Sequence, residues 1–394
     1  TRERETMNEL HSDVLIIGAG VMGSAIAYHI ARQGQRVLVV EQAAPAVTPA
    51  ASWASAGGVR RQGRHAAEAR LAIEAIERWQ TLEEELEADL QYRQGGNLLL
   101  AESDEEAEQL AAFVEQQHEH GFSDVRLVDR QEARALVPGL NDRVVAGSYS
   151  PRDGQADPAL TTRAFAAAAQ RHGAVYWNET RALALLRQGA RIVGARTARG
   201  EVRTGHVVLA AGAWSDELAA SVGLRLPIRT RALQMILSDA APPDTLRPVL
   251  SAVGRSLSLK QLAGGEFLLG GGWPGDPTPD RRSYTLRPDS IRGNWATACE
   301  LLPVVSRQHV ARSWCGLEAE SFDGIPFIGA VAGLDGLTLA LGFSGHGFAL
   351  SPAVGRCVAD LIAGRPAPGL DGLRPDRMTD FPHDQVEAFK TEQA

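Results

Sequence analysis

The chain has 394 residues, too many for one ordinary hydrophobic core, so its length predicts two closely joined domains or one large composite. Its net charge of -8 argues against a nucleic-acid partner, because phosphate binding needs a basic surface, and favours small-molecule ligands. Cys299, Cys315 and Cys357 are far apart and belong to no Cys-x-x-Cys or Cys/His cluster, so we expect neither a disulfide framework nor a metal site.

No apolar run approaches the roughly 20 residues of a membrane helix, and the polar start, residues 1–13, lacks the apolar core of a secretory signal. We therefore expect no membrane span and a cytoplasmic location. Residues 1–6 precede Met7 and are left out of the fold prediction.

The first predicted elements form a βαβ unit. Residues 14–17 are a short apolar run typical of a buried strand, residues 24–33 are a helical stretch, and residues 37–40 form a second apolar strand. From residue 66 to residue 90, apolar side chains recur at helical spacing with charges between them, which predicts one long amphipathic helix.

The middle of the chain alternates strands and helices. The pattern predicts a strand at 97–101, an acidic helix at 104–120, a strand at 144–149 and a helix at 159–171. Residues 175–211 then predict a meander of short strands with turns at 187–189 and 199–200.

The last third of the chain predicts a second sheet and a closing helix. Strands with Gly-rich turns at 228–238 and 256–272 indicate a mostly antiparallel sheet, the candidate substrate domain. Residues 337–341 predict a buried strand. A capping hydroxyl before a proline, at residues 351–352, predicts a helix that starts there and ends before Gly364.

The motif Gly18-Ala19-Gly20-Val21-Met22-Gly23 follows the first strand and opens the first helix, the context that dinucleotide binding requires. Gly18 permits the tight turn, Gly20 lets a pyrophosphate approach the backbone, and Gly23 lets helix and strand pack closely. Glu41 ends the second strand at the position of a carboxylate that binds ribose hydroxyls. The motif does not choose between NAD and FAD.

Four segments in order resemble the flavin-dependent amine and amino-acid oxidoreductases, which include sarcosine, glycine and D-amino-acid oxidases and the opine and proline dehydrogenases. They are SWASAGGVRR (52–61), LAAGAWS (209–215), DGIPFIG (323–329) and GFSGHGF (342–348). The resemblance covers nearly the whole chain. It implies an α/β fold in which FAD lies extended, with its adenosine at the βαβ unit, its isoalloxazine under the substrate sheet and the last Gly-rich loop and helix at its far end.

The resemblance also implies a division of the chain and a set of cofactor-binding residues. A Rossmann-type FAD-binding domain comprises residues 12–90, 151–227 and 309–382, the substrate domain comprises 91–150 and 228–308, and residues 1–11 and 383–394 are tails. The residues expected to bind FAD are Gly18, Gly20, Val21, Met22, Gly23, Glu41, Gln42, Ser52, Trp53, Ala56, Gly57, Gly58, Ala182, Ala211, Gly212, Trp214, Gly342, Gly345, His346, Gly347, Phe348 and Ala349.

Non-covalent FAD is expected, because Gly316 rather than Cys315 falls where monomeric sarcosine oxidases tether their flavin through a cysteine.

Arg61 falls where the family carries the arginine that binds the substrate carboxylate, with Arg60 as the alternative if the register is shifted by one residue. A surface role for Arg61 also stays open. Glycine oxidases carry an arginine where this chain has Glu318, which we expect either to face a cationic or second amino group or to pair with Arg312.

His346 lies between two glycines before a helix N-terminus, which suits close approach to a flavin and stabilises charge at its pyrimidine edge on reduction. Trp273 either walls an enlarged pocket or fills core. Leu268 replaces the lysine that sarcosine oxidases use to activate oxygen, so either O2 or another electron acceptor is possible. The stretch 342–346 is not a hydrolase nucleophile elbow, because its fifth position is His rather than Gly.

These observations predict an FAD-dependent oxidase or dehydrogenase that oxidises the C–N bond of an amino acid or of an N-substituted, glycine-type secondary amine. The substrate transfers a hydride to flavin N5 and becomes an imine, which hydrolyses to an oxo acid and an amine. Arg61, His346, Glu318 and Trp273 are its candidate catalytic residues. Two alternatives stay open: an FAD-binding subunit of a heteromeric dehydrogenase and an NAD-dependent dehydrogenase. Oligomers or heteromers are both compatible with the sequence.

Overall fold

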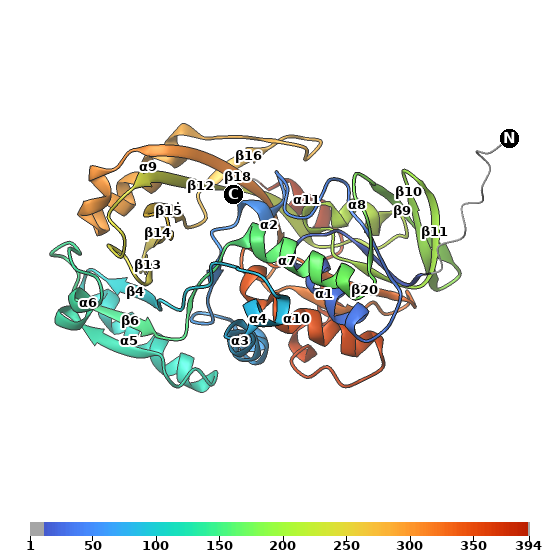
Figure 1. Ribbon diagram of the computed structural model, residues 1–394, viewed down its shortest axis with the longest axis horizontal. Coiled ribbons are helices and arrows are strands. Elements are labelled where there is room, and N and C mark those ends of the chain that lie inside the picture. Colours follow the sequence, from blue (N-terminus) through green and yellow to red (C-terminus); the bar gives the residue numbers. More distant parts are fainter. Residues whose placement is uncertain (1–11, 393–394) are drawn as a thin grey trace.

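The structure is a computed structural model that describes residues 12–392; residues 1–11 and 393–394, and with them most of the polar start, lie outside the described part. Two sheets organise these residues, and they lie toward opposite ends of the long axis (Figure 1). The helices near the middle of the view belong mainly to the half that contains the first sheet.

The first sheet has eight strands within residues 12–392, and its central strands are parallel. Its main path runs through β19 (Phe327–Ala330), β20 (Leu337–Leu341), β11 (Gly200–Leu209), β1 (Ser12–Ile17), β2 (Val37–Val40) and β8 (Val175–Trp177), and the hairpin of β9 (Ala182–Gln188) and β10 (Arg191–Thr197) extends from β11. Strand β1 is central because its residues pair in parallel with both β2 and β11. Its apolar run is buried on both faces, as parallel strands require.

A layer of helices covers one face of this sheet. Helix α1 (Val21–Arg32) packs between α7 (Pro158–Arg171) and α10 (Gly347–Ile362), and α3 (Ala66–Trp79) packs on the other side of α10. Helix α1 is buried almost all round, which explains its apolar sequence. Gly355 permits close contact, because a Cβ there would lie 2.8 Å from the carbonyl oxygen of Ala25.

The second sheet has ten strands among the described residues, and every pair except β4 with β13 is antiparallel. It contains β17 (Tyr284–Thr285), β16 (Pro274–Pro277), β12 (Ile228–Ala240), β15 (Glu266–Gly270), β14 (Arg255–Gln261), β13 (Val249–Ala252), β4 (Asn97–Ala101), β6 (Ala146–Ser150) and β5 (Arg126–Asp129), with β18 (Val310–Ser321) beside β12. Helices α5 (Asp104–Glu119), α6 (Arg130–Leu136) and α9 (Pro288–Leu301) pack on it. The predicted fold class is confirmed.

Two predicted helices have different bounds from those expected. The single helix over 66–90 is wrong, because the chain breaks between α3 and α4 (Leu82–Leu86), where Thr81 adopts a non-helical conformation. The pattern misled because Leu82 and Leu86 are buried like the apolar residues of α3 and continue its spacing across the break.

The closing helix starts four residues earlier than the expected cap at Ser351, at Gly347. Pro352 therefore lies inside α10, where it cannot donate to the carbonyl of Phe348. The hydroxyl of Ser351 donates to that carbonyl instead, at 2.9 Å. The serine thus replaces the missing backbone donor rather than capping the helix.

Two segments differ from the expected division of the chain. Strand β18 pairs with β12 along its length and so belongs to the second sheet, although the expected boundary places residues 309–382 in the FAD-binding domain. Residues 383–392, expected as part of a tail, include α11 (Val386–Thr391), which packs on β12. None of the helices formed by residues 12–392 is both long and apolar enough to cross a membrane.

Candidate active site

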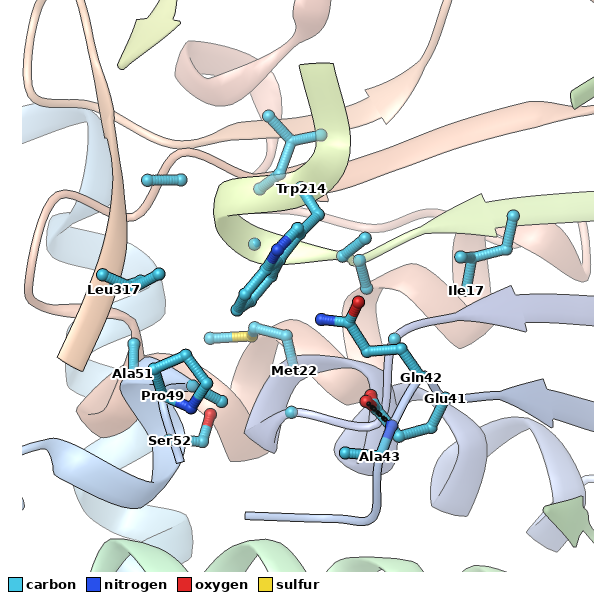
Figure 2. Close-up of a pocket in the computed structure, with 18 of the residues that line it drawn as sticks. Ile17, Met22, Glu41, Gln42, Ala43, Pro49, Ala51, Ser52, Trp214 and Leu317 are labelled. Atoms are coloured by element: carbon cyan, nitrogen blue, oxygen red, sulfur yellow. Dashed lines mark hydrogen bonds between the residues drawn. The ribbon is translucent and has the colours of Figure 1, made fainter. Parts of the chain in front are cut away.

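A cavity of about 560 Å³ runs from the carboxyl ends of β1 and β2 to β18 and the start of α10. Figure 2 shows Trp214 and Met22 in its middle, Glu41 and Gln42 toward one end and Leu317 toward the other. The cavity therefore lies at the carboxyl edge of the parallel strands, where α/β sheets bind their ligands. It also reaches the second sheet through β18.

The glycine turn at the first end is shaped by close contacts. Gly18 has φ +103°, and a Cβ there would lie 2.4 Å from the carbonyl oxygen of Ala210. A Cβ on Gly23 would lie 1.9 Å from the carbonyl oxygen of Gly18, so Gly23 lets α1 pack on the turn and does not itself line the cavity. Helix α1 has no side-chain cap at Gly20, and the N–H of Val21 donates to Ser52 Oγ at 2.9 Å. An uncapped helix N-terminus at a cavity suits a pyrophosphate.

Glu41 leaves β2 and supports the same turn. Its Oε2 accepts the N–H of Ala19 at 2.7 Å and its Oε1 accepts the N–H of Ala43 at 2.9 Å. Burial raises the pKa of Glu41, and these backbone donors partly offset the effect. With Gln42 it lines the end of the cavity that a ribose would occupy.

The opposite end is formed by a second glycine turn. Gly342, Gly345, Gly347 and Phe348 line the cavity, and α10 begins there without a side-chain cap. A second helix N-terminus therefore faces the cavity and favours negative charge in a bound ring.

Glu318 of β18 lines the cavity beside this turn. Burial raises its pKa to about 7, although the backbone N–H of Gly345 acts in the opposite direction. The expected pairing with Arg312 does not form, since Arg312 lies over the rings of Trp53 and Trp314 at 5.5 and 5.2 Å. The carboxyl group of Glu318 is thus available to a ligand.

Most of the expected cofactor residues line this one cavity: Gly18, Gly20, Val21, Met22, Glu41, Gln42, Ser52, Ala182, Ala211, Gly212, Trp214, Gly342, Gly345, Gly347 and Phe348. Segments that are far apart in the sequence are thereby brought together. The sequence did not indicate the loop 43–51 or Arg281 and Arg282, which also line it. Nothing in their composition marks them, although a loop that leaves β2 must pass this edge of the sheet.

The other expected cofactor residues, Gly23, Trp53, Ala56, Gly57, Gly58, His346 and Ala349, do not line the cavity. Gly57 and Gly58 shape the backbone beside it: Gly57 has φ +68°, and Gly58 belongs to β3 (Gly58–Val59), which pairs with β7 (Gly154–Gln155). The carbonyl of Ala349 accepts the indole N–H of Trp79 at 2.9 Å. Contact of these residues with the cofactor stays a prediction.

Arg61 is buried and already paired. Its guanidinium contacts the carboxylate of Asp124, and its Nε lies 3.8 Å from Oδ1 of Asp153. It does not line the cavity, and it is not a surface arginine. Its proposed role as carboxylate anchor therefore draws no support from this geometry.

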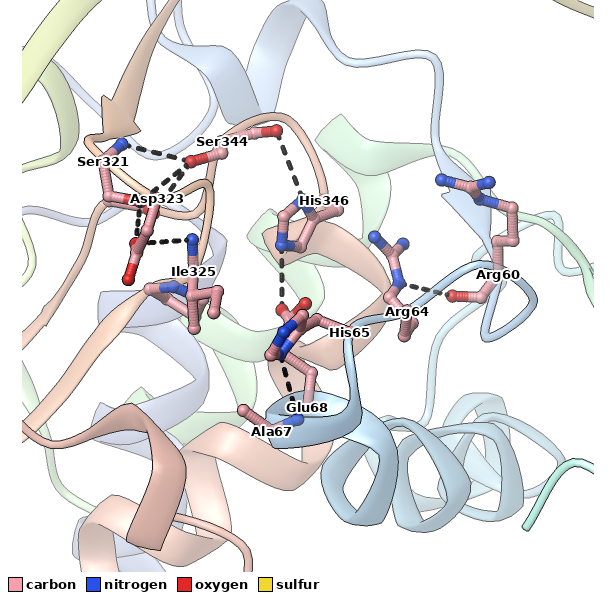
Figure 3. A network of polar contacts seen from close by, with 12 residues as sticks. Arg60, Arg64, His65, Ala67, Glu68, Ser321, Asp323, Ile325, Ser344 and His346 are labelled. Atoms are coloured by element: carbon pink, nitrogen blue, oxygen red, sulfur yellow. Dashed lines mark hydrogen bonds and ion pairs between the residues drawn. The ribbon is translucent and has the colours of Figure 1, made fainter. Parts of the chain in front are cut away.

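Its neighbours Arg60 and Arg64 belong to the polar network of Figure 3. The Nε of Arg64 donates to the carbonyl of Arg60 at 3.1 Å, and burial lowers the pKa of Arg64 to about 9. Within residues 12–392, neither guanidinium lies within ion-pairing distance of a carboxylate, in contrast to Arg61. Arg64 is buried and Arg60 is half-buried, and two such cations without a carboxylate partner are suited to an anionic ligand.

His346 links this network to the second glycine turn. Its Nε2 lies 2.8 Å from Oε1 of Glu68, and its Nδ1 lies 3.2 Å from the carbonyl oxygen of Ser344 (Figure 3). Burial lowers the pKa of His346, and the charge of Arg64 acts in the same direction, while Glu68 opposes both. The imidazole therefore positions the turn and does not enter the cavity.

Trp273 and Cys315 lie outside the cavity. The indole N–H of Trp273 donates to the carbonyl of Ser256 at 2.6 Å, and its ring packs against Gly293. This arrangement favours the expected role of Trp273 in packing over its expected role as a pocket wall. Cys315 is fully buried, and burial raises its pKa to about 12, as for an ordinary unreactive thiol. No group of His, Cys, Asp and Glu side chains in the described part of the chain is placed to hold a metal.

A second cavity of about 300 Å³ adjoins the first, and Ser55 lines both. Trp53 and Leu268 line it, together with Lys260 of β14. Lys260 was missed by the sequence reasoning, because a single lysine in a strand of alternating polar and apolar residues resembles a solvent-facing position.

The arrangement fits an extended flavin dinucleotide. It provides two opposed helix N-termini, a glycine turn that a Cβ would fill, and a carboxylate at the ribose position. A family model described as "FAD dependent oxidoreductase" matches residues 13–361.

Known proteins agree with this match. Glycine oxidase of Pseudomonas aeruginosa is 33% identical over 369 residues, covering 89% of this chain and 95% of that protein. Sarcosine oxidase subunit beta of Arthrobacter sp. is 27% identical over 376 residues, covering 91% and 89%. The solved structure of L-proline dehydrogenase from P. horikoshii superposes with a TM-score of 0.87 at 30% identity, covering 94% of this chain and 98% of that structure.

The predicted alternative of an NAD-dependent dehydrogenase is wrong. The chain belongs to the FAD-dependent oxidoreductase family and is an amine and amino-acid oxidoreductase of the glycine oxidase and sarcosine oxidase type.

Proposed function

We propose that the enzyme oxidises the C–N bond of an amino acid or of an N-substituted, glycine-type secondary amine, giving an imine that water hydrolyses to an oxo acid and an amine. FAD, when bound, accepts the hydride from the carbon beside the amino nitrogen. The observation that carries the proposal is the position of Glu318, whose half-buried carboxyl group lines the cavity beside the second glycine turn.

Glu318 is proposed to face the amino group of the substrate. An amine releases hydride from its neighbouring carbon only when its nitrogen lone pair is free, so a substrate that arrives as an ammonium ion must lose a proton. A carboxyl group with a pKa of about 7 can take that proton near neutral pH. The side chain thus binds the cationic form and releases the reactive one.

Arg60 is proposed to bind the substrate carboxylate in place of Arg61. Arg60 and Arg64 form no ion pair in the described part of the chain, whereas Arg61 is engaged by Asp124 and Asp153. Arg64 lies beside His346, and Arg60 lies beyond Arg64 (Figure 3). Neither arginine lines the cavity, but Gly345 and Gly347, the neighbours of His346, do. An unpaired guanidinium can form a bidentate pair with an incoming carboxylate without first losing a partner.

The test is anaerobic mixing of the FAD-loaded enzyme with a panel of amino acids and N-alkylglycines. Bleaching of the flavin absorbance by at least one secondary amine with a carboxylate on the α-carbon is the expected result. Enzyme that retains its yellow cofactor and is reduced by none of these amines would exclude the proposed reaction.

A second candidate is an FAD-binding subunit that passes electrons to a partner chain. The name of the similar protein from Arthrobacter sp., sarcosine oxidase subunit beta, favours it. Turnover of the isolated chain with O2 indicates an oxidase, and turnover only with an artificial acceptor indicates a dehydrogenase subunit.

A further inference from the structure

Lys260 is a buried amine that the reaction described above does not use. It lies on β14 and is 2% exposed. Leu257 and Leu259 of the same strand pack into the core of the second sheet, so Lys260 points to the opposite face, like its cross-strand neighbour Leu268. Among residues 12–392, no side chain forms an ion pair with its Nζ and no group accepts a hydrogen bond from it. Burial lowers its pKa to about 7.

The second cavity, into which Lys260 points, is cationic although the chain as a whole carries a net charge of -8. Arg93, Arg163 and Arg312 also line it, against the single carboxylate of Asp157. That carboxylate is already used, because Oδ1 of Asp157 accepts the N–H of Leu160 at 2.7 Å and caps α7.

Two of these cations are already engaged. Arg93 pairs with Asp244 at 2.9 Å, and Arg163 donates to the carbonyl of Ala46 at 3.3 Å. Arg312 lies over two indole rings, and in the described part of the chain it pairs with no carboxylate. Lys260 and Arg312 therefore form no ion pair at the cavity wall, and Lys260 is shielded from solvent. The charge of Asp157 raises the pKa of Lys260, but the opposite effect of burial is larger.

The remaining walls are apolar. Leu237, Leu262 and Leu268 line the cavity, as does Trp314. A ligand with a short aliphatic chain that ends in an acid group would fit this cavity. Its methylene groups would contact the apolar walls, and its acid group would pair with the buried amine of Lys260. Ser55, which lines both cavities, marks where such a chain would enter from the cofactor side.

We propose that the second cavity selects substrates whose nitrogen substituent or side chain carries a second carboxylate, and that this carboxylate pairs with Lys260 Nζ. The inference rests on the proposed function and narrows it. The enzyme would then act on dicarboxylic secondary amines or amino acids in preference to their neutral counterparts. Lys260 is in this role a specificity residue, because it contacts a group remote from the C–N bond.

The experiment compares Lys260→Met with the wild-type holoenzyme on matched substrates, N-butylglycine and N-(3-carboxypropyl)glycine. Removal of the ammonium group should lower kcat/KM for the acid-bearing substrate about tenfold or more, and should leave kcat/KM for N-butylglycine unchanged or raised. Lys390→Met, at a partly exposed site on α11 that lines neither cavity, is the control and should alter neither value. Lys260→Arg should restore part of the preference, since it keeps the charge.

Equal losses on both substrates, or no change on either, would overturn the inference while leaving the proposed function intact. If neither these two amines nor any member of the panel described above bleaches the flavin of the wild type, the proposed function fails instead. In that case, the role of Lys260 is still decided by the binding of glutarate and of butyrate, which is measured from the shift of the flavin absorbance. Tighter binding of glutarate than of butyrate that is lost in Lys260→Met supports the anion site, and equal binding by both proteins refutes it. FAD content and melting temperature verify that each variant is folded.

Discussion

The Nε2 atom of His346 lies 2.8 Å from Oε1 of Glu68, so the turn that opens α10 is tied to the first turn of α3. The contact is shielded from solvent, since Glu68 is 2% exposed. It holds the second glycine turn from behind, on the side away from the cavity.

Replacing Glu68 by alanine should therefore weaken both the fold and cofactor binding. A buried imidazole nitrogen that loses its partner costs about 1–3 kcal/mol, which denaturant unfolding can measure. Glu68→Gln keeps an acceptor and should cost less, and Glu105→Gln on the exposed side of α5 serves as control. Full stability and unchanged FAD affinity in Glu68→Ala would show that the contact does not position the turn.

Glu318→Gln should change the pH dependence of activity. The carboxyl group can take the substrate proton only when ionised, so wild-type kcat/KM should fall as the pH drops through about 7. The glutamine variant should have low kcat/KM for ammonium substrates and should lack this step. A variant that keeps the wild-type profile would assign the step to another group.

The same substitution has a predicted effect on stability. The folded-state pKa of Glu318 is raised above its unfolded value, so its contribution is present below the unfolded pKa and is lost as the pH rises through about 7. The melting temperature of Glu318→Gln relative to the wild type should therefore increase between about pH 5 and about pH 8. A constant difference across this window would mean that the carboxyl titrates normally.

Gly18→Ala should abolish FAD retention. The new Cβ would lie 2.4 Å from a backbone oxygen that cannot move aside, and φ +103° is strained for alanine. Gly34→Ala is a matched control: its φ is +82°, yet nothing lies within 4 Å, so it should cost only about 1–2 kcal/mol and leave FAD binding intact. The ratio of flavin absorbance to protein after gel filtration distinguishes the two. Equal ratios would place the turn outside the cofactor site.

Arg60→Lys and Arg61→Lys should separate binding from folding. Loss of the planar guanidinium at Arg60 should raise KM for carboxylate substrates about tenfold with little change in melting temperature. Arg61→Lys should mainly destabilise the fold, because it disturbs a buried pairing with Asp124 and Asp153. The reverse pattern would restore Arg61 as the carboxylate anchor.

The sequence was informative where backbone geometry dictates residue type. Gly18 must be glycine because of its dihedral angle and its contact with Ala210, and the apolar runs of β1 and β2 must be buried on both faces. Both constraints are local, so they could be predicted with nearly correct bounds. The resemblance then supplied the second glycine turn, which no local rule connects to the first.

Side-chain direction was the information that the sequence lacked. Arg60 and Arg61 follow the short strand β3, and neighbouring residues on an extended chain point to opposite sides, so a shift of one residue decides which of them meets the substrate. Lys260 presents the same difficulty, because its surroundings come from residues as distant as Trp53 and Trp314. Only the assembled sheet shows that it is buried.

One face of β18 contributes to both compartments, with Glu318 in the first cavity and Trp314 in the second. Four residues of extended strand separate them, which corresponds to roughly 13 Å. Because β18 is hydrogen-bonded to β12 along its length, that interval cannot stretch. The strand thus sets a fixed distance between the wall that Glu318 contributes to the first cavity and the wall that Trp314 contributes to the second.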